Sequence, residues 1–188
     1  VAKLTAVWGK LAPSTQARKI SALRQFFGFL IDEGEREDDP TSALPRPVPR
    51  RPLPKILDHE QVARLFERAE MEARTGEGAA LRLLCMLELL YGSGLRASEL
   101  VSLPVSAVPR DAPFITLKGK GGVTRMVPVS RRAKGALQNW LDVREGKSAW
   151  LFPSRKSHIT RIRLYQMLKA LAVRADLPPE KLSPHVLR

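Results

Sequence analysis

The sequence predicts a mainly helical α+β protein. A linker separates a short helical N-terminal part from a larger, mostly helical domain with a small antiparallel sheet. Apolar residues recur at three- and four-residue spacing, five prolines crowd into residues 45–54, and two short β-type segments flank a glycine-rich tip. The 188 residues, 44% of them hydrophobic and 27% charged, suffice for a small domain beside a medium one.

Residues 1–44 contain one amphipathic helix. Residues 13–15 offer an N-cap, Gly34 ends the helix, and apolar side chains follow at helical spacing between them, at Ala17, Ile20, Leu23, Phe27 and Leu30. Its polar side carries Arg18, Lys19 and Arg24. A lone amphipathic helix needs partners to be stable. We therefore expect this segment to be the end of a helical domain, with further residues of the protein before Val1.

Residues 45–56 form the predicted linker. Five prolines in the ten residues 45–54 exclude a helix or a central strand and favour an extended spacer. The linker arginines, including Arg50 and Arg51, are placed to lie along a phosphate backbone. A solvated basic linker is the alternative interpretation.

Residues 57–188 form the larger domain. Asp58 begins an amphipathic helix, and Tyr91 to Gly94 form a turn before a short helix from Leu95. The remaining expected elements are an apolar helix (79–90), two strands of a hairpin (114–117 and 126–129), helices (131–144 and 161–175) and a brief extended piece (150–153).

Positive charge is concentrated in the last third of the chain. The net charge is +13, and residues 118–188 hold sixteen Lys and Arg against four Asp and Glu. A surface of that sign attracts polyanions, so DNA or RNA is the first candidate partner. A ribosomal-type RNA binder and a merely basic surface are the alternatives.

Cysteine and histidine usage argues against disulfides and metal. Cys85 is the only cysteine, which fits a reducing cytoplasm, and its apolar surroundings indicate a buried, inert thiol. The three histidines lack metal-ligand spacing. The longest apolar run, Leu83 to Tyr91, contains Glu88 and is too short to span a bilayer, so no membrane association is expected.

Three motifs carry candidate chemistry. The first, Gly-Leu-Arg-Ala-Ser-Glu-Leu at 94–100, places Arg96 at the start of a helix. Taken alone, Arg96 could simply form a structural ion pair with Glu99, three residues on. The second places Lys120 between glycines at the hairpin tip, where solubility alone would also explain a lysine. The third, Leu-Ser-Pro-His-Val-Leu-Arg at 182–188, puts His185 and Arg188 on the first turn of a helix, a reasonable phosphate site.

Together and in this order, the three motifs resemble the tyrosine recombinase (phage integrase) family, and within it the bacterial Xer recombinases most. The resemblance implies a core-binding helical domain ending within residues 1–44, the linker at 45–56, and a catalytic domain over 57–188. It also implies an enzyme that cuts and rejoins DNA through a 3′-phosphotyrosine without metal or cofactor. Four protomers, identical or from two related recombinases, assemble on two double-stranded DNA sites in this family.

The resemblance also assigns residue roles. Arg96 and Arg188 clamp the phosphate oxygens, Lys120 protonates the leaving 5′-oxygen, and His185 assists proton transfer, while Glu99 buttresses Arg96. Further DNA contacts are expected from basic residues in both domains, namely Arg18, Lys19, Arg24, Arg50, Arg51, Lys118 and Arg125.

The nucleophile is where this sequence departs from the family. The only tyrosines, Tyr91 and Tyr165, precede the third motif, whereas the family tyrosine follows it. We therefore expect a catalytic domain without its C-terminal part, which binds duplex DNA but forms no covalent complex. The alternatives are a type IB topoisomerase and a non-catalytic DNA-binding fragment. Chromosome dimer resolution and element integration both stay open as roles.

Overall fold

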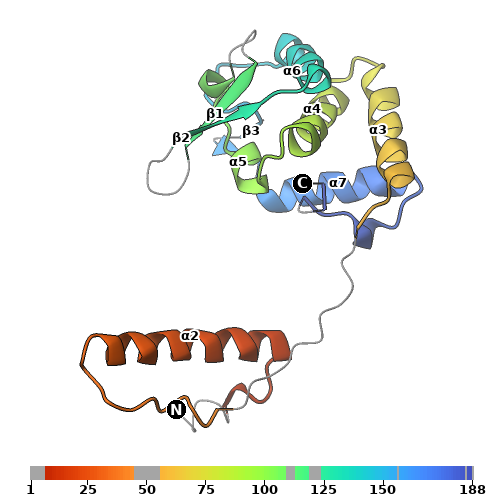
Figure 1. Ribbon diagram of the computed structural model, residues 1–188. Coiled ribbons are helices and arrows are strands. Elements are labelled where there is room, and N and C mark those ends of the chain that lie inside the picture. Colours follow the sequence, from red (N-terminus) through yellow and green to blue (C-terminus); the bar gives the residue numbers. More distant parts are fainter. Residues whose placement is uncertain are drawn as a thin grey trace. The chain divides into compact units, whose positions relative to one another are not determined.

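The computed structural model describes residues 7–44, 56–108, 113–118, 124–155, 157–184 and 186–187. The chain divides into two compact units, Val1–Pro54 and Lys55–Arg188, each described here by itself (Figure 1). Several residues singled out in the sequence lie outside the described residues: Arg50, Arg51, Lys120, His185, Arg188 and the side chain of Lys118.

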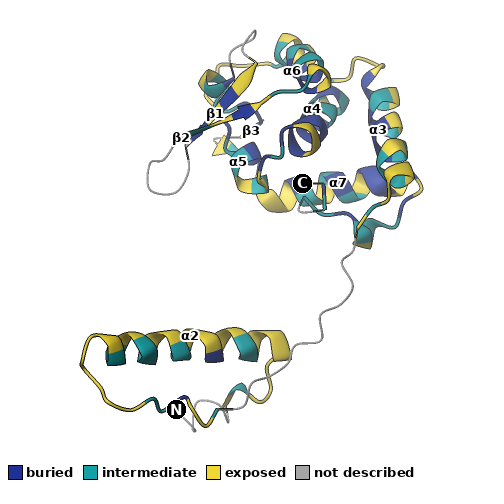
Figure 2. Cartoon of the chain, in the orientation of Figure 1, coloured by how far each residue is buried: buried dark blue, intermediate teal, exposed yellow. Residues whose placement is uncertain are grey.

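The first unit is built on helix α2, Pro13–Asp32. Its N-cap is Ala12, which has no capping side chain, so the cap expected at 13–15 lies one residue earlier and Pro13 occupies the first turn. Gly34, with a φ of 74°, follows the helix end as predicted. Only Ile20 of α2 is buried, and one long side of the helix is exposed (Figure 2). The described part of this unit therefore leaves apolar surface on α2 uncovered.

The second unit has five α-helices among its described residues, and local signals set most of their limits. Helix α3, His59–Ala73, starts at Asp58, whose side chain accepts from the Gln61 amide while Gln61 accepts from the Asp58 amide. The other helices are α4 (Gly78–Gly92), α5 (Ala97–Val101), α6 (Arg131–Val143) and α7 (Arg161–Arg174). Two short 3₁₀ turns lie at Val105–Ala107 and Pro179–Lys181.

Helix α4 forms the centre of this unit. It packs between α3 and α6, and Leu87, Leu89 and Leu90 are fully buried (Figures 1 and 2). The helix extends to Gly92, beyond the predicted end at residue 90, and the chain leaves helical conformation before Gly94, which adopts a φ of 59°. The expected turn from Tyr91 is therefore wrong for Tyr91 and Gly92.

Two small antiparallel sheets complete the unit. The predicted hairpin is present as β1 (Phe114–Lys118) and β2 (Thr124–Pro128), with Phe114 opposite Pro128 and Lys118 opposite Thr124. A second pair, β3 (Pro153–Ser154) with β4 (Ser157–His158), was not predicted. Strands of two residues are too short to produce a periodic pattern. The mainly helical class with a small antiparallel sheet is confirmed.

Cys85 is fully buried in α4, and burial raises the pKa of its thiol, as expected for an inert cysteine. Within the described ranges, no helix has the length and apolar character to cross a membrane. Among the same residues, no three His, Cys, Asp or Glu side chains are grouped to hold a metal ion.

Candidate functional site

The backbone of Arg96 is fixed by its neighbours, while its side chain is exposed to solvent. It follows the end of α4 and is the N-cap of α5, while the preceding Leu95 is fully buried and fixes the chain at this point. The Arg96 side chain is 54% exposed. A side chain that binds phosphate in a preorganised way needs a fixed backbone and an accessible guanidinium, and Arg96 has both.

Glu99, three residues after Arg96, accepts two hydrogen bonds from it. One carboxylate oxygen accepts from the Arg96 amide at 2.7 Å, and the other accepts from its guanidinium at 2.9 Å. Burial alone would raise the pKa of Glu99, but these bonds and a further one from Arg125 bring that pKa below its ordinary value. Glu99 is therefore ionised at neutral pH, and the pairing expected from the sequence is present.

Arg125 connects the hairpin to the same carboxylate. Its guanidinium on β2 donates to Glu99 at 2.8 Å. Leu117 on β1 lies opposite Arg125, one pair before the last described pair of the hairpin, Lys118 and Thr124. The strand that follows Lys120 in sequence is thus tied to the helix that begins with Arg96. Sequence spacing gave no signal for this contact, because 26 residues separate its partners.

A hollow of about 430 Å³ brings the first and third motifs together. Arg96 and Ser98 line it from the first motif, and Ser183 and Pro184 line it from the third. Pro184, Val186 and Leu187, the described residues at this point, are in turn conformation rather than in the predicted helix, and the Val186 amide donates to the Ser183 carbonyl at 3.0 Å. An α-helix requires successive backbone hydrogen bonds between residues four apart. The described residues here have one backbone hydrogen bond, between residues three apart.

The same hollow is lined by two residues that the sequence analysis did not assign to the site. Arg161 and Tyr165, on the first turns of α7, line it together with Arg96. The Lys169 ammonium lies 4.6 Å from the centre of the Tyr165 ring. The Thr160 side chain caps α7 by accepting from the Arg163 amide, and the helix begins at the predicted residue 161. The motif spacing, however, did not predict which end of α7 would face Arg96.

Arg96 also borders a second hollow of about 980 Å³. Its other walls come from α5 and the segment that follows it, the middle of β1, and Trp150, and they include Ser102 and Thr116. Arg96 is the guanidinium that these two hollows share, with Ser98 beside it. A polyanion on this side of the unit would therefore meet Arg96 from either hollow.

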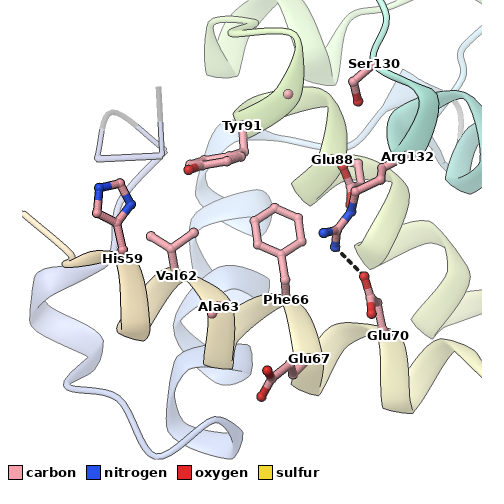
Figure 3. A pocket seen from close by; sticks show the side chains of 11 residues that line it. His59, Val62, Ala63, Phe66, Glu67, Glu70, Glu88, Tyr91, Ser130 and Arg132 are labelled. Atoms are coloured by element: carbon pink, nitrogen blue, oxygen red, sulfur yellow. Dashed lines mark hydrogen bonds and ion pairs between the residues drawn. The ribbon is translucent and has the colours of Figure 1, made fainter.

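An ion cluster fixes the end of α4 that leads to Arg96. Arg132 donates to Glu88 at 2.9 Å and to Glu70, and its guanidinium lies 5.2 Å from the Phe66 ring centre (Figure 3). Burial raises the pKa of Glu88, and the charge of Arg132 partly offsets this. Arg132 therefore offsets the negative charge of the buried Glu88 carboxylate, which lies eight residues before Arg96.

The two tyrosines have packing contacts. Tyr91 stacks edge-on against Phe66, with ring centroids 5.3 Å apart, on the wall of a hollow of about 610 Å³ between α3, α4 and α6 (Figure 3). Tyr165 lies beneath Lys169 as described above. These contacts agree with the interpretation of both as packing residues with a polar tip.

The basic residues of α2 differ in their contacts. Arg24 donates to the Leu44 carbonyl at 3.0 Å, and it therefore ties down the segment that follows the helix. The Lys19 ammonium lies 5.1 Å from the centre of the Trp8 ring, and Arg18 is exposed. All three lie in the first unit, so their placement adds nothing to the geometry around Arg96.

Residues 55–188 match the model of the phage integrase family, and the chain belongs to that family. The expected resemblance is confirmed.

Two curated relatives illustrate the match. The chain is 69% identical over its full length to tyrosine recombinase XerC of Erythrobacter litoralis, and 49% identical over 94% of its length to tyrosine recombinase XerD of Brucella suis. It spans 61% of the length of each.

Solved structures agree in fold. The chain superposes on XerH bound to a palindromic difH substrate with a TM-score of 0.71 at 23% identity, covering 98% of this chain and 54% of that one. For the XerA recombinase the TM-score is 0.61 at 23% identity, with 97% and 62% covered. At these identities the likeness supports the fold alone.

Proposed function

We propose that this chain is the phosphate-binding part of a site-specific recombinase that cuts and rejoins double-stranded DNA through a 3′-phosphotyrosine. The observation that carries the proposal is the hollow where Arg96 meets Ser183 and Pro184, the residues directly before His185. The 69% identity to a recombinase is the reason that a type IB topoisomerase is not proposed.

The proposed chemistry assigns each motif one task. A phosphodiester under attack gains negative charge on its oxygens, and Arg96 with Arg188 stabilises that charge because a guanidinium fork can bind two oxygens at once. Lys120 protonates the leaving 5′-oxygen, and His185 assists the proton transfer. Glu99 and Arg125 are positioning residues, since they act through Arg96.

The proposal also covers the domain organisation, the assembly and the DNA contacts of the protein. Residues 1–44 would belong to a core-binding domain, 45–56 to a linker and 57–188 to the catalytic domain, working as a cytoplasmic tetramer of identical or related subunits on DNA. Duplex contacts are proposed for both domains, at Arg18, Lys19, Arg24, Arg50, Arg51, Lys118 and Arg125. Chromosome dimer resolution and element integration are the two roles that fit.

The 188-residue polypeptide itself is proposed to bind duplex DNA without cleaving it. Tyr91 and Tyr165 precede the third motif and are engaged in packing. On a nicked suicide substrate with the recombination site of the XerC relative, we expect a complex that denaturant dissolves. A covalent adduct mapped to either tyrosine by mass spectrometry would disprove this.

Binding is tested by fluorescence anisotropy with a duplex of about 30 base pairs at fixed salt. Arg96→Gln should weaken binding roughly 10- to 150-fold, because a charge-assisted phosphate contact contributes about 1.5–3 kcal/mol. The matched control is Arg131→Gln, an exposed arginine that lines none of the hollows described above. Equal loss in the two variants would mean that only overall charge matters, and would count against Arg96 as a phosphate ligand.

A further inference from the structure

A third cationic site lies on the other edge of α7. A cavity of about 550 Å³ between α3, α4 and α7 is lined by four arginines, Arg68, Arg82, Arg163 and Arg174. It shares no lining residue with the two hollows around Arg96. Arg161 and Tyr165 face Arg96, whereas Arg163 and Arg174 of the same helix face this cavity. The cavity is therefore separate from the proposed DNA site.

Glu72 neutralises two of these arginines. Its carboxylate accepts from Arg174 at 2.7 and 2.9 Å and from Arg68 at 2.7 Å. The hydrogen bond from Arg174 is the main reason that the pKa of Glu72 lies below its ordinary value, and Arg68 adds to it. With both oxygens engaged, Glu72 has little capacity for a third guanidinium.

Arg82 and Arg163 are left without an anionic partner among the described residues. The Nε of Arg82 is buried and has no hydrogen-bond partner. Burial lowers the pKa of Arg82, and the like charge of Arg163 lowers it further. A partly desolvated guanidinium beside a second cation is costly unless an anion joins them.

The start of α4 opens on the same cavity. Ala79 and Ala80 line it, and the N-cap Glu77 makes no side-chain capping bond. The positive end of a 15-residue helix therefore adds to the field of the two arginines. Glu77 also lines the cavity, so its six charged side chains, four arginines and two glutamates, leave a net positive charge.

We propose that this cavity binds a small phosphate dianion between Arg82 and Arg163. Two guanidinium forks suit a tetrahedral oxyanion better than a planar carboxylate, because each fork can take a separate pair of oxygens. The volume suits a small ligand. Arg82 lies ten residues before the end of α4, about 15 Å along the helix, so the ligand would be distant from a DNA phosphate held at Arg96. The proposal does not depend on recombinase activity.

The test is calorimetric titration of the full 188-residue chain with inorganic phosphate, at ionic strength kept constant with sodium chloride. All titrations use the Arg96→Gln background, so that phosphate bound at the candidate DNA site does not contribute. We expect saturable binding, and at least a tenfold higher Kd in Arg82→Gln/Arg163→Gln. The control is Arg74→Gln/Arg131→Gln, which removes the same charge from exposed positions outside the cavity and should keep the Kd.

Thermal unfolding separates ligand binding from a structural role. Without phosphate, Arg82→Gln should leave the Tm unchanged or raise it, since it removes an unpaired, partly buried charge. With phosphate, the Arg96→Gln parent and the Arg74→Gln/Arg131→Gln control should gain Tm, whereas Arg82→Gln/Arg163→Gln should not. Absence of saturable binding to the parent, or an equal Kd in the cavity and control variants, would overturn the proposal. So would a lower Tm of Arg82→Gln in the absence of phosphate. If the cavity variant instead lost only duplex DNA affinity, the site would belong to DNA and the proposal would again be wrong.

Discussion

Arg132→Gln tests whether the ion cluster at the end of α4 supports the fold in the way its geometry indicates. The Glu88 side chain is 6% exposed, whereas that of Arg132 is 61% exposed. Removing one partner of a fully buried pair costs about 3–5 kcal/mol. Because solvent already reaches Arg132, we expect a loss of about 2 kcal/mol at pH 8. For a unit of this size, that lowers the Tm by roughly 6–8 °C.

The pKa of Glu88 determines how the stability loss in Arg132→Gln should depend on pH. The pKa of Glu88 is raised in the folded protein, so the folded state binds more protons than the unfolded state from above about pH 4.3 up to that pKa. Stability therefore falls as the pH rises through this window. Without Arg132 the folded pKa rises further and the window widens. The stability difference between the variant and the parent should thus be small near pH 4.5 and full at pH 8.

Urea unfolding followed by circular dichroism at pH 4.5, 6 and 8 measures these differences. Glu88→Gln in the Arg132→Gln background should restore more than half of the loss, because the buried charge is then gone. Arg131→Gln, next to Arg132 and exposed, should change stability by less than about 0.5 kcal/mol. A loss that is equal at all three pH values and is not rescued by Glu88→Gln would refute the electrostatic reasoning.

Three further predictions follow from single contacts. Asp58→Ala removes the cap of α3 and should lower the unfolding free energy by about 1 kcal/mol in urea titrations, with Asp58→Asn retaining most of it. Trp140→Phe deletes the bond from the indole to the Leu151 carbonyl at 3.0 Å and should cost about 1–3 kcal/mol, because a buried acceptor is left unpaired. Glu99→Gln should cost about 1 kcal/mol at pH 7 after allowance for solvent screening, measured by the same titrations. Since the pKa of Glu99 is lowered, that difference should be full above the ordinary glutamate pKa and should shrink as the pH falls below it towards the folded pKa; a difference that does not change with pH would contradict it.

Elements with local signals were predictable. The start of α3 follows from Asp58 and Gln61, which lie three residues apart and cap each other. Helices α6 and α7 begin at the predicted residues, 131 and 161, where Ser130 and Thr160 accept from amides three residues on. The end of α4 was less predictable, because glycine and tyrosine tolerate helix and turn alike, and tertiary packing decided between them.

The sequence by itself determined the class of protein: the order of the three motifs, the basic last third and the helical periodicity depend on neighbours in the chain, and they sufficed for the family. Tertiary structure alone decided the partners of the charges. Arg125 meets Glu99 across 26 residues, Arg132 meets Glu88 across 44, and Arg174 meets Glu72 across 102. Such pairings depend on which helix faces pack together, and a charge carries no sequence signal of the distant side chain that will neutralise it. The same reason leaves Arg82 and Arg163 unremarkable in the sequence and joined in one cavity by the fold.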